Sequence, residues 1–296
     1  MSMDAFSKRH PIVNFLFFLG AIGFGVVIQH PAYLAAGLGW GIAYYLLLKG
    51  PGGLKMLLAL LPLLLITMFI NPLFNTYGAT VLGYVFGRPY TLEALFYGAA
   101  IAAVLAVTLV WFGCSGTVLT SDKFTSLFGS LIPSPSLLLV MVLRLIPDLM
   151  RKARQFAGAR RSIGKGSAEN ASNKEKITDG MTIISALADW ALEGGVITGD
   201  SMRSRGYGCG KRTSFMIYRL TGIDGVLLAV QGILGAVVVA TAVSGGVAAT
   251  YTPELYIAPV SGVHILGFAA YCTYLSVPTV LHIKEAIQWH ISKSKI

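Results

Sequence analysis

Hydrophobic residues gather along this chain in long runs that are separated by short polar stretches. Each run has 18 residues or more, and about 20 apolar residues suffice for a helix to cross roughly 30 Å of hydrocarbon. We therefore expect an all-α integral membrane protein with about six transmembrane helices. The expected spans are residues 12–29, 31–48, 54–71, 92–112, 222–246 and 257–281.

A seventh stretch, residues 71–87, is only partly apolar and is rich in glycine and turn residues. It fits a re-entrant segment, an interfacial segment or a short extra span. The number of spans therefore lies between six and eight. The first run has no small-residue cleavage site after it, so we expect it to be a retained span rather than a signal peptide.

Residues 113–220 form the polar part of the chain, with 15 Lys/Arg and 8 Asp/Glu. A first helix is expected from about Pro135 to Ile163, with a kink at Pro147, because a proline ring clashes with the turn before it. A polar linker follows, and a second helix is expected from about Gly180 to Arg205. The first helix has apolar residues at helical spacing, namely Val142, Ile146, Leu149, Ala153 and Phe156.

The charges predict how the chain is oriented. The net charge is +10 and only 12% of residues are charged, whereas soluble domains have about 25%. With both termini in the cytoplasm, 22 of the 23 Lys/Arg residues lie on the cytoplasmic side and Arg88 alone lies outside. Cytoplasmic loops of membrane proteins are enriched in Lys and Arg. The basic charge thus indicates a multi-pass protein with cytoplasmic termini, not a nucleic-acid-binding protein.

Several classes of chemistry are disfavoured by the sequence. The three cysteines are far apart and the histidines lack metal-ligand spacing. "GCGKRT" (208–213) lacks the first glycine and the final Ser/Thr of a phosphate-binding loop. The expected spans carry almost no carboxylates, which ion-coupled carriers use to hold ions or protons. We expect no catalytic site, no metal and no cofactor, and we expect any energy for transport to enter from the cytoplasm.

The two cytoplasmic helices both end in a tip containing arginine and glycine. One interpretation is that they are amphipathic surface helices with basic side chains reaching into water. The other is that their tips insert into a partner, because the flat guanidinium group binds carboxylates in pairs and keeps its charge when buried.

The tip "SMRSRGYGCGKRTSF" (201–215) resembles the second cytoplasmic signature of the transmembrane (T) component of energy-coupling-factor (ECF) transporters. Three other stretches are similar to parts of this family: "HPIVNFLFFLG" (10–20), "NPLFNTYGATVLGYVFGRPYTLEAL" (71–95) and "RLIPDLMRKARQFAGARRSIG" (144–164). The resemblance covers nearly the whole chain in order. It divides the chain into N-terminal transmembrane helices (1–112), a coupling-helix region (113–220) and C-terminal transmembrane helices (221–296).

The family's signature is an Ala-Arg-Gly triplet at each tip, and the chain departs from it. At the second tip Ser204 replaces alanine, whereas Arg205 and Gly206 match. At the first tip the triplet falls on Ser162, Ile163 and Gly164, so the arginine is lost. Arg160 and Arg161 lie just before it and could substitute. The resemblance implies that these eight residues dock the ATPases.

What the resemblance implies is a non-catalytic subunit of an ABC importer in the cell membrane of a prokaryote. Its two long coupling helices would dock into two ABC ATPase subunits, and its membrane helices would hold a small substrate-binding (S) subunit for a vitamin or a metal ion. ATP hydrolysis would belong to the partner ATPases. The alternatives from other classes are an ordinary ABC permease that forms the substrate pathway itself, a membrane-bound enzyme and a structural membrane anchor.

Overall fold

The computed structural model describes residues 4–76, 78, 80–85, 87–129, 133–164, 172–210, 218–245, 247–251, 255–257, 259 and 261–293. Within these ranges the chain is an all-α protein, as expected from the sequence, and it also has two short antiparallel hairpins that were not expected. The helices are α1 (Pro11–Val27), α2 (Pro31–Lys49), α3 (Gly52–Phe74), α4 (Leu92–Val118), α5 (Ser121–Gly129), α6 (Pro133–Ser162), α7 (Asn173–Ser204), α8 (Gly222–Val243) and α9 (Gly262–Lys293). The strands are β1 (Val81–Val85), β2 (Arg88–Thr91), β3 (Ala249–Thr250) and β4 (Tyr256–Ile257).

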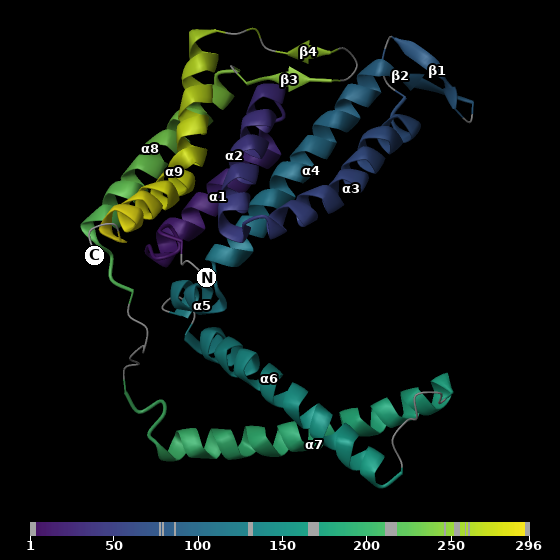
Figure 1. The fold of residues 1–296 in the computed structure, drawn as a ribbon, viewed down its shortest axis with the longest axis vertical. Coiled ribbons are helices and arrows are strands. Elements are labelled where there is room, and N and C mark those ends of the chain that lie inside the picture. The colour runs from purple at the N-terminus through teal and green to yellow at the C-terminus, as the bar shows by residue number, and fades with distance from the viewer. Residues whose placement is uncertain are drawn as a thin grey trace. The chain divides into compact units, whose positions relative to one another are not determined.

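The chain forms two units. Unit 1 contains Met1–Phe124 and Tyr218–Ile296, so that it is built from both ends of the sequence, and unit 2 contains Thr125–Ile217. Unit 1 is a helical bundle in which α4 packs against α1, α2 and α3, while α9 packs against α2 and α8 (Figure 1).

The first two helices of the bundle begin in the same way. His10 precedes Pro11 at α1, and His30 precedes Pro31 at α2. Each histidine caps its helix, because its Nδ1 accepts a hydrogen bond from the backbone N–H two residues later, at 3.2 Å and 3.3 Å respectively. Proline suits the first helical position, where its missing N–H is not needed. A repeated His-Pro pair therefore defines where both helices start.

Aromatic side chains dominate the core of the bundle. Trp111 of α4 is fully buried, and its indole N–H donates to the Gly37 carbonyl of α2 at 3.1 Å. Phe17 of α1 lies 5.6 Å from the Trp111 ring and stacks on Tyr274 of α9 at 5.2 Å, measured between ring centroids. The core thus joins α1, α2, α4 and α9 around a single tryptophan.

The two ends of the bundle differ in charge. The hairpins β1–β2 and β3–β4 lie at one end, which carries Arg88 (Figure 1). The start of α1, the end of α2, the start of α3 and the end of α4 lie at the other end, where the basic residues of unit 1 gather. These include Lys8, Arg9, Lys49, Lys55 and Lys123. The fold therefore separates the basic residues from Arg88 as the threading of six spans requires.

The segment 71–87 is not a further span. Its first residues extend α3 to Phe74, and β1 then pairs with β2 from Val81↔Thr91 to Val85↔Arg88. Of the three alternatives left open for this segment, a short extra span is not what its described residues form. The described strand is too short to cross a bilayer, since a transmembrane strand needs about 9–11 residues.

Among the described residues, six helices are long and apolar enough to cross a membrane: α2, α3, α4, α7, α8 and α9. The helix α1 is also apolar but has only 17 residues. Five of the six expected spans thus coincide with these helices, while α7 was expected to be a cytoplasmic helix. Asp189 and Glu193 lie in the middle of α7, and carboxylates are costly inside hydrocarbon. The chain is a multi-pass membrane protein.

Unit 2 consists mainly of α6 and α7. The helix α6 matches its expected bounds and continues through Pro147. The helix α7 begins at Asn173, seven residues before the expected start, because Ser172 and Glu175 form a capping box. In that arrangement each side chain satisfies a free backbone N–H of the first turn. Part of the expected polar linker is therefore helical.

Candidate functional site

The end of α7 carries Arg205 at its cap. The helix ends at Ser204, and the next residue but one, Gly206, has a φ of +76°. The N–H of Tyr207 turns back and donates to the Met202 carbonyl at 3.0 Å. This is the Schellman arrangement, which needs a left-handed residue that glycine adopts without steric cost. Glycine therefore terminates this helix close to the end expected from the sequence.

The end of α6 shares the glycine turn of this arrangement. Ser162 is its last residue, and Ile163 follows as the cap. Gly164 has a φ of +70°, and its N–H donates to the Arg161 carbonyl at 3.0 Å. At α7 the corresponding bond joins the Gly206 N–H to the Arg203 carbonyl, also at 3.0 Å. The triplets Ser-Ile-Gly and Ser-Arg-Gly therefore occupy equivalent cap positions.

This equivalence shows which side chains correspond between the two tips. Ile163 takes the place of Arg205, and it is 68% exposed. Arg161 takes the place of Arg203, two positions before the cap, and both are exposed. The first tip therefore presents one arginine before an apolar cap, whereas the second tip presents two arginines, one of them at the cap.

Arg160 differs from its neighbour because it is used within unit 2. Its Nε donates to Asp179 of α7, and both side chains are largely buried. The Lys152 ammonium of α6 lies 5.5 Å from the centre of the Trp190 ring, also on α7. These two contacts hold α6 against α7 where the helices cross, and the chain runs in opposite directions in the two helices. Of the two arginines suggested by the sequence, Arg161 points to solvent while Arg160 holds the helix pair together.

The two tips lie far apart on the helix pair. Arg160, at the end of α6, contacts Asp179, whereas Arg205 follows 26 residues later along α7. At 1.5 Å per residue this corresponds to about 40 Å. Figure 1 shows α6 and α7 crossing, with the end of α7 running away from the end of α6. The eight residues suggested by the sequence therefore form two separate sites.

Both sites combine a helix C-terminus with cations. The last carbonyls of a helix carry partial negative charge, which lowers the free energy of a nearby arginine. Each guanidinium offers donors in a flat fork that fits a carboxylate and stays charged at any physiological pH. Such a tip can dock into a groove that supplies carboxylates.

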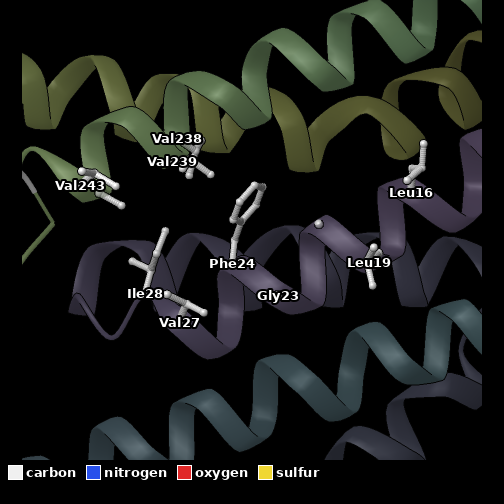
Figure 2. A pocket seen from close by; sticks show the side chains of 11 residues that line it. Leu16, Leu19, Gly23, Phe24, Val27, Ile28, Val238, Val239 and Val243 are labelled. Carbon is white, nitrogen blue, oxygen red and sulfur yellow. The ribbon is translucent and has the colours of Figure 1, made fainter.

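An apolar groove of about 580 Å³ lies between α1 and α8 in unit 1 (Figure 2). Phe24 points across it towards Val238 and Val239, and Gly20 and Gly23 leave room on the α1 side. The side chains that line the groove offer no hydrogen bond to a polar substrate. Its chemistry suits an acyl chain or the face of another helix.

Sequence reasoning found the residues of both tips but missed how Arg160 is used. Asp179, its partner, falls in the segment that was expected to be a polar linker. The capping box at Ser172 could have revealed that Asp179 lies on a helix. Lys211 and Arg212 of the second tip lie outside the described residues. Within the described ranges, no group of three or more His, Cys, Asp or Glu side chains could hold a metal ion.

Comparison with known proteins gives no assignment for this chain. No protein-family profile matches the sequence, and no curated protein is significantly similar to it.

Proposed function

We propose that this chain is the membrane scaffold and energy-coupling subunit, or T component, of an ECF-type ABC importer. The two helix tips dock one each into two ATPase subunits, and the bundle holds a small substrate-binding membrane subunit. ATP-driven movement of the ATPases passes through α6 and α7 to the membrane and drives uptake of a micronutrient such as a vitamin or metal ion. The chain itself hydrolyses no ATP.

The observation that carries this proposal is the pair of equivalent helix ends. Two long helices of one unit end in the same Ser-X-Gly cap, expose arginine there and separate their tips by about 40 Å. A solvated amphipathic surface does not require matched ends. Two separate partner subunits, each with an acidic groove, explain both the match and the distance.

The charge distribution supports a cytoplasmic location for these tips. The basic end of the bundle is the end from which the chain leaves for unit 2 and to which it returns. Basic flanks favour the cytoplasmic side. In the proposal α7 lies outside the membrane, so that both tips face the ATPases in the cytoplasm of a prokaryotic cell.

Co-purification tests the proposal. The tagged chain is expressed in its native host, extracted in mild detergent, and the proteins that remain bound are identified. We expect two ATPase copies and one small hydrophobic subunit. ATPases without a small subunit would favour an ordinary ABC permease, and the absence of any ATPase would contradict the proposal.

The orientation gives a second prediction, for which the chain supplies its own probe. Cys209 is exposed at the second tip, whereas Cys114 is buried. We expect a membrane-impermeant maleimide to label Cys209 only after the cytoplasmic face is opened. A cysteine at Arg161, in a Cys209→Ser chain, should show the same sidedness, and a cysteine at Arg88 the opposite one. If Arg161→Cys and Cys209 are labelled from opposite sides, α7 spans the membrane and the two tips cannot serve a common partner.

A further inference from the structure

Residues 4–10, here called the N-terminal strap, fold onto the basic end of the bundle before α1 begins. The Phe6 ring is fully buried, with its centroid 5.2 Å from that of Phe17 and 6.1 Å from that of Phe18. A short segment of turns thus has its own apolar anchor in the core.

Asp4 anchors the beginning of the strap. It is only 4% exposed, and its Oδ2 accepts a hydrogen bond from the Tyr44 hydroxyl of α2 at 2.5 Å. Its Oδ1 lies 2.7 Å from Nδ1 of His282 on α9. Lys8 further along pairs with Glu285 of α9 at 2.5 Å. The strap therefore joins helices from the N-terminal and C-terminal parts of the sequence.

The strap also contacts residues 119–124, where the chain leaves unit 1. This segment is here called the outgoing junction. Lys123 is only 7% exposed, and its ammonium group donates to the backbone oxygen and the hydroxyl of Ser7 and to the Val118 carbonyl. When the Asn14 amide nitrogen donates to the Phe6 carbonyl, the amide oxygen accepts a hydrogen bond from the Lys123 ammonium group at 3.3 Å. Burial lowers the pKa of Lys123 to about 8, so the group is mostly charged at neutral pH and needs these acceptors.

The end of the strap contacts residues 218–224, where the chain returns to unit 1. This segment is here called the returning junction. The His10 ring lies edge-on to the Tyr218 ring, with 6.3 Å between the centroids. The Asp224 carboxylate caps α8 by accepting from the Thr221 N–H and hydroxyl, and the Arg9 side chain is near enough for a favourable electrostatic interaction with it. Only Lys8 and Arg9 lie between Ser7, which contacts the outgoing junction, and His10, which contacts the returning junction.

We propose that the N-terminal strap is a common clamp for both junctions, so that the two connections to unit 2 are held as one joint. Lys123 and Tyr218 are its positioning residues. Release of either junction loosens the other, because both are bonded to the same short segment. The clamp is a property of unit 1 alone. Its role in transmitting motion from unit 2 rests on the proposed function.

Hydrogen exchange of the purified full chain tests the clamp directly. The variant Lys123→Met removes the ammonium group but keeps an apolar chain of similar length. We expect amides of both junctions to exchange about 10-fold to 100-fold faster, since a hydrogen bond to a charged group contributes about 1.5–3 kcal/mol. The middle of α4 should keep the exchange of the unaltered protein, which shows that the bundle remains folded. Lys55→Met, at an exposed lysine of the same end, is the matched control and should change neither junction.

A reciprocal variant keeps the test decisive if Lys123→Met does not fold. Tyr218→Ala alters only the returning junction, and the clamp predicts faster exchange at the outgoing junction as well. If each variant accelerates only its own junction, the two connections are independent and the proposal is wrong.

The functional consequence is measured separately. In the assembled complex, Lys123→Met should reduce uptake per ATP hydrolysed while ATPase co-purification persists, which a general loss of folding would not do. Loss of the ATPases together with uptake would contradict the transmitting role. If the unaltered chain binds no ATPase, the proposed function fails but the exchange result still decides the clamp.

Discussion

Replacing Arg205 with glutamate is expected to detach the ATPase from the second helix tip. Arg205 is exposed at the cap of α7 and makes no ion pair within the described part of the chain. In the proposed complex its guanidinium is buried against carboxylates of the partner. Removing one member of a buried ion pair costs about 3–5 kcal/mol because the other charge is stranded. The affinity should therefore fall by about two to four orders of magnitude, and reversing the charge adds repulsion.

The measurement is ATPase recovery on the tagged chain, together with substrate uptake by whole cells. Arg151→Glu is the matched control. It makes the same change of charge on α6, where Arg151 is exposed and pairs only with Asp148 one turn away, and such surface pairs contribute little. If Arg205→Glu retains the ATPases and full uptake, the second tip is a solvated helix end. If Arg151→Glu is as damaging, the effect arises from overall charge rather than from docking.

The second large effect is expected in the membrane bundle, at Trp111. Shortening it to alanine empties the centre of the core that joins α1, α2, α4 and α9, and it removes the hydrogen bond to Gly37. Large-to-small changes of a buried tryptophan cost about 3–5 kcal/mol. The midpoint of thermal unfolding in detergent should fall by on the order of 10 °C.

A buried cysteine gives the readout for this prediction. Cys114 is buried one turn after Trp111, so a thiol-reactive dye should reach it only on unfolding. Cys209 and the partly exposed Cys272 are first changed to serine. Phe112→Ala is the matched control, because the Phe112 ring is 57% exposed on the same helix, and its removal should leave the midpoint within a few degrees. An equal loss of stability in both variants would mean that the side of α4 assigned to the core is wrong.

The sequence predicted the helices of the bundle well, because long apolar runs leave few alternatives. It left residues 71–87 open among three alternatives and did not predict the hairpin at residues 81–91. There the hairpin depends on the pairing of Val81 with Thr91 and of Val85 with Arg88, and this pairing has no signal in hydropathy. The start of α7 was missed for a local reason, since the capping box at Ser172 was assigned to a linker.

The candidate site was predictable in its residues but not in its geometry. The resemblance to a known family identified the two tips and the triplet at each of them, and the structure showed that both triplets are helix caps. Arg160 and Arg161 have different surroundings because of the way α6 crosses α7. The crossing brings Asp179 to Arg160 and not to Arg161. Such a contact between helices depends on tertiary packing. Periodicity within one helix cannot reveal it.

The insertion of about 90 residues, Thr125–Ile217, into the middle of the bundle has a consequence for biogenesis. During synthesis α1 to α4 enter the membrane first, while Phe17 still lacks Tyr274 and Asp4 still lacks His282. At roughly 5–20 residues per second, unit 2 takes on the order of 5–20 s to translate before α8 and α9 can follow. The incomplete bundle of α1 to α4 therefore stays in the bilayer during this interval without α8 and α9. Membrane chaperones or proteases would encounter its incompletely packed core at this stage.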